Sequence, residues 1–221
     1  KDCKPILIAH DGATRLPSPV AGVKIFGPDD LQFLSQSPLG LYGRTYSYDP
    51  TYLIYTDGTS ASPRGVLHAH RALWGRRQLQ TEWLGLTQKD RILHTGADNW
   101  ARSIGYGLMD PLCRGAAVIL LSPPKLRRVF DQALPILVEL TGATVVAAMP
   151  AHFITALKSG TVKADSMPSL TRAVSSGAIL PAHVTQEWQS VTGRPEECLR
   201  QSDRRHRDAS LGSCPDAGLL E

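Results

Sequence analysis

Two features of this 221-residue chain predict an α/β fold with a largely parallel sheet. First, short apolar segments alternate with segments of helical composition from residue 91 to residue 192, which is typical of βαβ units. Second, the segments Ala116–Leu121 and Ala143–Met149 are apolar throughout. Uninterrupted apolar strands are expected where helices cover both faces of a sheet, as they do in parallel sheets.

The individual elements follow from composition and spacing, in chain order. The expected strands are Pro5–Ala9, Val23–Gly27, Tyr52–Thr56, Gly65–His70, Arg91–Thr95, Ala116–Leu121, Ala143–Met149 and Leu170–Ser175. The expected helices are Ala72–Leu84, a segment with Ile104, Leu108 and Leu112 at four-residue spacing, Leu126–Leu140 interrupted by Pro135, His152–Lys158, and Pro181–Val191. Proline suits the first turn of the last helix, where its missing N–H removes no helical hydrogen bond.

Three regions are expected along the chain. Residues 1–47 hold short strands, loops rich in proline and glycine, and a connector, whereas residues 48–193 form the regular core. Residues 194–221 contain many arginine, aspartate and serine residues, few apolar ones and no periodicity. Such a segment buries little surface, so the tail is expected to be disordered.

The overall composition is that of a globular protein, with 42% hydrophobic and 20% charged residues. The net charge of +4 is too small to predict nucleic-acid binding. The segment Arg64–Arg91 carries six cations against two carboxylates, a local excess that attracts an anionic ligand. Its arginines are expected on a solvated helix face: Arg71, Arg76 and Arg77.

The four cysteines lie far apart without a C-x-x-C pair, which favours neither a zinc site nor a disulfide framework and makes a reducing cytoplasm the expected location. His68 and His70 share a strand face but have no third ligand nearby, so structural roles and no metal site are expected. Cys113 is expected to pack in a helix. No run of eighteen apolar residues occurs, so no membrane span is expected, and the oligomeric state is not indicated.

The most informative stretch is Tyr55–Ala72, with the sequence YTDGTSASPRGVLHAHRA. Small hydroxyl side chains around a glycine, with one arginine beside them, make a pocket that suits a polyphosphate. The same composition also describes a surface turn. A nucleotide-binding protein of the P-loop class is a poor third hypothesis, because no G-x-x-x-x-G-K-[ST] motif occurs and a strand, in place of a helix, is expected after the loop.

This stretch resembles the phosphate-loop signature of the adenylate-forming enzymes, the superfamily of acyl-CoA synthetases, adenylation domains of peptide synthetases and luciferases. The matching positions are Tyr55, Thr56, Gly58, Thr59, Pro63 and Gly65, with Ser60 and Arg64 as conservative replacements. Three later segments are also similar to the family: 97–120, 145–157 and 172–193. The resemblance implies part of the large N-terminal domain of an acyl-CoA synthetase.

The resemblance further implies a two-step reaction in which a small carboxylic acid attacks Mg-ATP, giving an acyl-adenylate and pyrophosphate, and coenzyme A then displaces AMP. In such an enzyme Arg64 would be the catalytic cation over the pyrophosphate. The implied phosphate-binding residues are Thr56, Asp57, Gly58, Thr59 and Ser60, and the implied adenine-contacting residues are Ser176, Gly177 and Ala178. The acyl pocket would be shaped by Trp100, Met149, Pro150 and His152. ATP, Mg²⁺ and coenzyme A are the implied cofactors, with no nucleic-acid or membrane partner.

The chain departs from the family pattern at several points. Asp57 replaces the usual Ser and places a carboxylate beside phosphates, and Ala61 replaces the second Gly. After Gly193 the family's Tyr-Gly-x-Thr-Glu motif is missing, and a shift of reading frame near residues 194–199 is the hypothesis for this ending. An alternative function is therefore a non-catalytic remnant that at most binds nucleotide.

Overall fold

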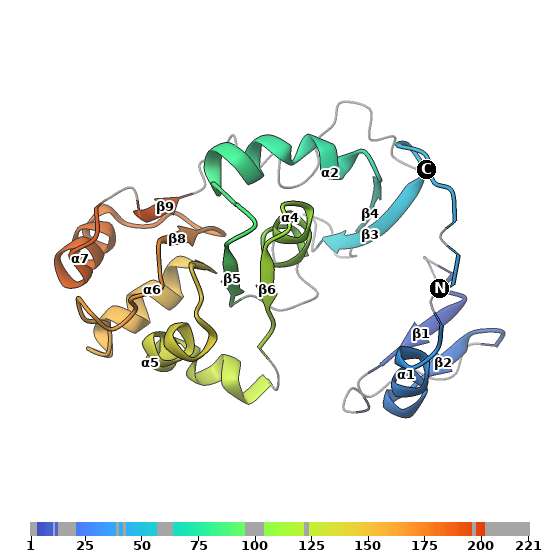
Figure 1. Ribbon diagram of the computed structural model, residues 1–221, viewed down its shortest axis with the longest axis horizontal. Helices are drawn as coiled ribbons and strands as arrows, with labels where there is room; N and C mark the ends of the chain where they lie inside the picture. Colours follow the sequence, from blue (N-terminus) through green and yellow to red (C-terminus); the bar gives the residue numbers. More distant parts are fainter. Residues whose placement is uncertain are drawn as a thin grey trace. The chain divides into compact units, whose positions relative to one another are not determined.

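The computed structural model describes residues 4–10, 12, 21–38, 40–41, 43–56, 64–95, 104–121, 124–195 and 198–201. The chain divides into two compact units, Lys1–Tyr46 and Ser47–Glu221, whose elements are labelled in Figure 1. The second unit contains all the described residues that the sequence associates with a ligand.

The first unit contains two short parallel strands and one helix: β1 Leu7–Ala9, β2 Lys24–Phe26 and α1 Pro28–Ser35. Both expected strands are present, but α1 was not expected. The helix begins with proline at its first position, and the Asp30 carboxylate accepts a hydrogen bond from the Gly27 backbone N–H at 2.9 Å. The proline that suggested a loop is therefore a helix start.

The second unit opens with the hairpin of strands β3 Pro50–Thr56 and β4 Arg64–Ala69, which pair antiparallel. Tyr52 lies opposite His68, and Thr56 lies opposite Arg64. Side chains alternate between the faces of the hairpin: Ile54 and His68 are buried, whereas Leu53 is exposed. The hairpin thus has a packed face and an open face, and its far end joins the loop of residues 57–63.

The main sheet has five strands in the order β6-β5-β7-β8-β9, and each neighbouring pair is parallel. The strands are β5 Arg91–His94, β6 Ala117–Ile119, β7 Val145–Ala148, β8 Arg172–Ser175 and β9 Leu199–Gln201. The parallel α/β fold expected from the sequence is confirmed.

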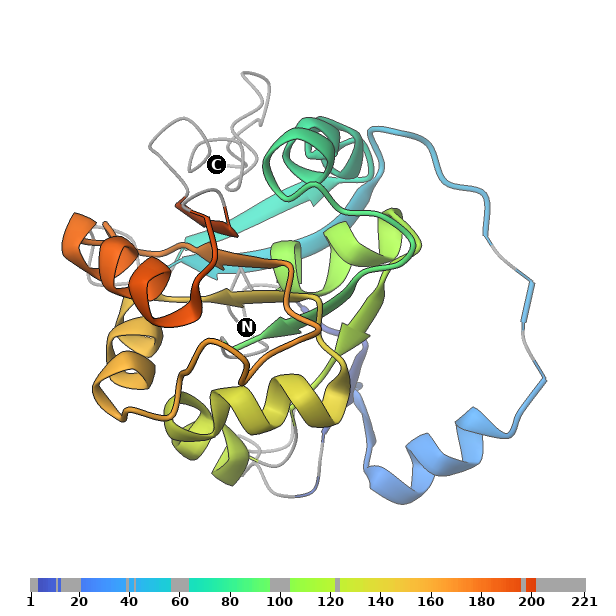
Figure 2. The same cartoon turned by 60° about the vertical axis from the view of Figure 1, so that its left-hand side comes forward.

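Helices cover both faces of this sheet, which explains why its strands are apolar throughout. Figure 2 shows three of them on one side: α5 Pro124–Thr141, α6 Pro150–Lys158 and α7 Ala182–Thr192. Leu93, Val146 and Ala173 point into the core beneath these helices. Ile92 and Val145 point to the opposite face, where they pack with the π-helices η1 Leu79–Trp83 and η2 Gly105–Met109.

Three helical regions differ from the expected form. The region 72–84 is α2 Ala72–Gly75 followed by η1, and α5 continues through Pro135 without interruption. The helix expected from Leu108 and Leu112 exists as η2 followed by α4 Asp110–Cys113. However, Leu108 and Leu112 are 38% and 58% exposed. The wide turns of a π-helix and the packing of the opposite side leave this apolar face outward, and Cys113 is also exposed.

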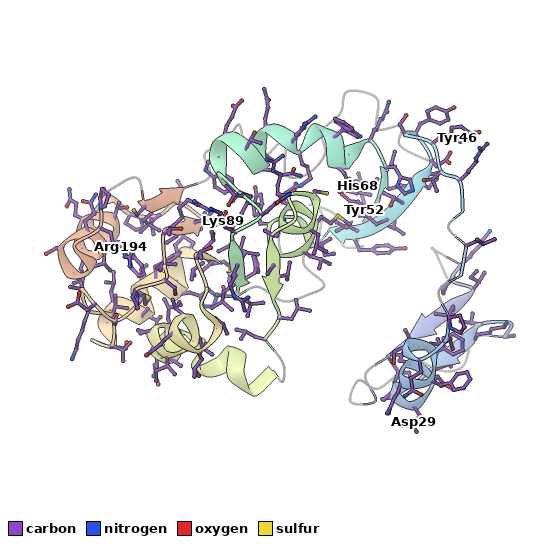
Figure 3. The ribbon with its side chains drawn as sticks, viewed as in Figure 1. Asp29, Tyr46, Tyr52, His68, Lys89 and Arg194 are labelled. Atoms are coloured by element: carbon purple, nitrogen blue, oxygen red, sulfur yellow. The ribbon has the colours of Figure 1, made fainter. Side chains whose placement is uncertain are left out.

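Described residues continue beyond the expected end of the core at Gly193, over 194–195 and 198–201. The Arg194 guanidinium donates hydrogen bonds to the carbonyl oxygens of Met167, at 2.6 Å, and Leu170, on the α7 side of Figure 3. Strand β9 then pairs with β8, and Leu199 is buried. The rest of the tail expected to be disordered, residues 202–221, lies outside the described residues. Within the described part of the chain, no helix is long and apolar enough to cross a bilayer.

Candidate nucleotide and acyl site

The hairpin brings together the two ends of the phosphate-loop stretch. Thr56 ends β3 directly opposite Arg64, the first residue of β4, and Arg64 is exposed. Because side chains alternate along a strand, Arg64 lies on the same face of the hairpin as Val66 and His68. The loop residues expected to bind phosphates, Asp57, Gly58, Thr59 and Ser60, lie outside the described residues.

The base of the hairpin holds an aromatic pair. The rings of Tyr52 and His68, both labelled in Figure 3, stack with centroids 4.5 Å apart and planes 11° from parallel. Burial raises the pKa of the Tyr52 phenol. Burial, assisted by the positive charge of Arg76, lowers the pKa of His68, so the imidazole is neutral at physiological pH. The described residues contain no group of three or more histidine, cysteine or acidic side chains suited to a metal.

A buried ion pair lies next to this base. Arg76 is only 5% exposed and Asp110 is fully buried. The Arg76 guanidinium donates to the two Asp110 carboxylate oxygens at 2.8 and 2.5 Å, and the Gln80 amide donates at 3.1 Å. The expectation that Arg76 lies on a solvated face was therefore wrong. The lone aspartate in the apolar stretch GLMDPL was an available signal, because a buried carboxylate requires a partner.

The carboxyl ends of β7 and β8 bring together two other sequence-predicted groups. Ser176 follows β8 and is buried, with its backbone N–H donating to the Ala148 carbonyl at 3.1 Å. Gly177 has a φ of 105°, which side-chain-bearing residues rarely adopt, and Ala178 is exposed. This geometry presents backbone and a small side chain at the edge where α/β proteins bind ligands.

The neighbouring strand end carries the residues expected to shape the acyl pocket. Met149 follows β7 and is 36% exposed, Pro150 is buried at the first position of α6, and His152 is half-buried two residues further on. Trp100, the fourth residue predicted for this pocket, lies outside the described residues. Because β7 and β8 are adjacent, the two predicted segments lie side by side.

Two buried hydroxyl groups at this edge were missed in the sequence. Thr95 and Ser175 are 7% and 0% exposed, and neither hydroxyl oxygen has a hydrogen-bond partner among the described residues. Ser175 pairs with Ala148, and the β5–β7 register, continued by one residue, sets Thr95 beside the same alanine. The two hydroxyls therefore flank Ala148 on one face of the sheet. Serine and threonine at strand ends are too common for sequence alone to select these two.

The opposite, amino edge of the sheet has a structural role. Asp90 accepts hydrogen bonds from the backbone and hydroxyl of Thr87, at 2.7 and 2.9 Å, and from the Thr144 hydroxyl at 2.8 Å. It also forms an ion pair with Arg172 at 2.6 Å. Burial alone would raise the pKa of Asp90, but these hydrogen bonds and the Arg172 charge lower it below the ordinary value. Asp90 thus ties β5 to β7 and β8.

Comparison with known proteins identifies the family of this chain. The model of the AMP-binding enzyme family matches residues 42–200. This chain belongs to the AMP-binding enzyme family. The matched range extends past Gly193 into β9, and it includes both the hairpin and the carboxyl edge of the parallel sheet.

Similar AMP-binding proteins include two CoA ligases that act on different acids. A 3-hydroxybenzoate/4-hydroxybenzoate–CoA ligase of Thauera aromatica is 30% identical over 148 residues, which cover 66% of this chain and 27% of the ligase. The mitochondrial malonate–CoA ligase of Xenopus laevis is 27% identical over 207 residues, covering 85% of this chain and 36% of the ligase. This chain therefore spans about a third or less of the relatives it matches.

Solved structures agree on the fold. Apo MatB from Rhodopseudomonas palustris has a TM-score of 0.73 and 18% identity, over 91% of this chain and 40% of MatB. The ATP-bound form of the same protein has a TM-score of 0.66 over 82% of this chain and 36% of MatB. The described architecture is accordingly that of an AMP-binding enzyme over part of its length.

Proposed function

We propose that this chain is the nucleotide-binding core of an ATP-dependent acyl-CoA synthetase. In this reaction a carboxylate attacks the α-phosphorus of ATP, the bond to pyrophosphate breaks, and coenzyme A thiolate then displaces AMP from the acyl-adenylate. The observation that carries the proposal is the family match over residues 42–200. The CoA ligases among the relatives support the acid–thiol ligase branch.

The proposed role of Arg64 is to stabilise the negative charge of the leaving pyrophosphate. The side chain is exposed and stands at the hairpin end, opposite Thr56. An arginine fork donates to two phosphate oxygens at once, which makes it a strong partner for this group. Fixed donors of this kind stabilise charge that develops in the transition state. Thr56 and the loop residues Asp57 to Ser60 would complete the phosphate site.

The proposed adenine site is the turn after β8. The positive φ of Gly177 and the small side chain of Ala178 leave the backbone accessible to a flat ring. On the adjacent strand end, Met149, Pro150 and His152 would line the acyl side together with Trp100. The two sites would then share one edge of the sheet, which suits a reaction that joins a carboxylate to the nucleotide.

Magnesium would enter this site with the nucleotide. The described residues offer no cluster of three metal-ligating side chains, and Mg²⁺ commonly binds through phosphates, waters and one or two carboxylates. Among the residues predicted to bind the phosphates, Asp57 would supply such a carboxylate. The ion would neutralise phosphate charge there and reduce the repulsion from Asp57.

The proposed acid is a small aryl carboxylate. Hydroxybenzoate and benzoate CoA ligases are among the relatives of the chain, at 25–30% identity. Malonate ligases also match. The chain should therefore be assayed with both benzoate, which has a flat aryl ring, and malonate, which has a second carboxylate. A preference for malonate over benzoate would contradict the aryl proposal and leave the ligase proposal intact.

The test is a calorimetric titration of Mg-ATP into the full chain, followed by assays of pyrophosphate release and thioester formation. We expect saturable heat that Arg64→Ala abolishes or strongly weakens. Arg77→Ala is the matched control, because Arg77 is also exposed and lies outside the two hairpin strands, with its guanidinium 5.0 Å from the centre of the Trp74 ring. No heat from a folded sample would refute nucleotide binding, and ATP binding without acid-dependent pyrophosphate release would refute the ligase activity.

A further inference from the structure

The buried ion pair of Arg76 and Asp110 makes more contacts than charge neutralisation requires. Asp110 is fully buried, and its oxygens receive two arginine donors and one amide donor. The guanidinium also lies 5.1 Å from the centre of the Tyr106 ring. Arg76, Asp110, Gln80 and Tyr106 are called the Arg76 cluster below.

The π-helix η2 is shaped to admit this cluster. A Cβ atom on Gly105 would lie 2.6 Å from Nη2 of Arg76, so only glycine leaves room for the guanidinium there. A Cβ atom on Gly107 would lie 2.8 Å from the Cβ and Cγ atoms of His94. Through Gly105, its first residue, η2 touches Arg76, and through Gly107, its middle residue, it touches His94 at the carboxyl end of β5.

The cluster also adjoins the base of the β3–β4 hairpin. Helix α2 begins at Ala72, three residues after β4 ends at Ala69, and Arg76 is the residue that caps its carboxyl end. Between β4 and α2, the backbone N–H groups of His70 and Arg71 donate to the carbonyl oxygens of Asp49 and Ser47, which precede β3, at 3.1 and 2.6 Å. The charge of Arg76 also acts on Tyr52 and His68. Tyr52 and His68 are the stacked pair that closes the hairpin base. The same two strands end at Thr56 and Arg64, the entry and exit of the phosphate loop. The Arg76 cluster thus adjoins the base of the hairpin, and Arg64 lies at its far end. The orientation of the base therefore sets the direction in which Arg64 points.

We propose that the Arg76–Asp110 pair is a positioning unit that sets the orientation of the β3–β4 hairpin, and with it Arg64, relative to the carboxyl end of β5. Buried ion pairs add little net stability compared with apolar packing, and one attested use is to select a single arrangement of elements. A planar fork holding both carboxylate oxygens fixes direction as well as distance. The role for Arg64 in this inference rests on the proposed function.

The first measurement does not depend on any ligand. Arg76→Lys keeps the charge but loses the fork, so we expect faster amide hydrogen exchange in residues 50–56 and 64–69 and unchanged exchange in β7. Arg77→Ala serves as the surface control and should change neither. Equal acceleration in the hairpin and in β7, or no acceleration in the hairpin, would overturn the inference, because the pair would then act only on global stability or not at all.

The second measurement tests the connection to the nucleotide. We expect Arg76→Lys to weaken Mg-ATP binding roughly 2- to 30-fold, the range of coupling through residues that do not touch a ligand. In an Arg64→Ala background, with the residual binding measured at raised Mg-ATP concentration, the same change should have almost no further effect. Full additivity would overturn the action through Arg64. If the wild-type chain fails to bind ATP, the proposed function fails, whereas hydrogen exchange still decides whether the pair orients the hairpin.

A milder variant keeps the test decisive if Arg76→Lys does not fold. Gln80→Met removes only the third donor to Asp110 and preserves the volume of the side chain. We expect this variant to accelerate exchange in the hairpin alone, to a smaller extent than Arg76→Lys. Unchanged hairpin exchange in a folded Gln80→Met protein would count against the positioning role.

Discussion

Replacing Gly107 with alanine tests how closely η2 must approach the end of β5. The new methyl group would lie 2.8 Å from two carbon atoms of His94, about 1 Å closer than the best carbon–carbon separation. The Cβ of His94 is attached to the strand and cannot rotate away, so η2 must shift. Overpacking of this kind costs about 1–3 kcal/mol. Alanine recovers about 1 kcal/mol because glycine is a poor helix former.

Gly75→Ala is the matched control. Gly75 is also helical, but a Cβ there would meet nothing within 4 Å, so only the gain in helix propensity remains. We therefore expect Gly75→Ala to stabilise the chain by up to about 1 kcal/mol and Gly107→Ala to fall about 1–3 kcal/mol below it. Calorimetry should report this gap as about 2–4 °C per kcal/mol. Equal melting temperatures for the two variants would refute the close approach of η2 to His94.

Three further predictions concern the edges of the sheet. Asp90→Asn should lower the free energy of unfolding in urea by about 3–5 kcal/mol, because it leaves the Arg172 cation without its partner. A decrease below about 1 kcal/mol would mean that the ion pair is solvated. Because the folded-state pKa of Asp90 is lowered, its contribution is complete above the unfolded value of about 3.9 and is lost as pH falls through the folded value. The stability gap between wild type and Asp90→Asn should therefore close in acid, and a gap that widens there would contradict the sign. Ser175→Ala should leave stability unchanged or raise it by about 1 kcal/mol, since the buried hydroxyl has no partner among the described residues, and a large loss of stability would indicate a hydrogen bond.

Part of the candidate site was predictable because it depends on local sequence. The two apolar segments around the loop stretch predicted a strand on each side of it, and the structure pairs these strands with Thr56 opposite Arg64. The apolar strands predicted a parallel sheet covered on both faces. In a parallel sheet the carboxyl ends of neighbouring strands, here β7 and β8, lie at the same edge. The roles of Arg64, Ser176, Gly177 and Ala178 in binding, and that of Met149, Pro150 and His152, remain predictions.

Other parts of the site depend on partners that are distant in the sequence. Arg76 resembled a solvated arginine because its partner, Asp110, lies 34 residues away. The buried hydroxyls of Thr95 and Ser175 could be recognised only once the strand register set them on either side of Ala148. Likewise, β9 has little apolar character of its own, and it forms because β8 offers an unpaired edge with backbone groups that require partners.

The sequence by itself determined most of the strands and helices, although not α1 or β9, and also the parallel sheet and the family, because periodicity, apolar runs and a short motif are properties of neighbouring residues. Only the tertiary structure decided which side of each helix is buried. Leu108 and Leu112 have helical spacing yet face outward, while Tyr106 and Asp110 face inward toward Arg76. The physical reason is that a helical period fixes which residues share a face, whereas the partner that covers a face is contributed by distant segments of the chain.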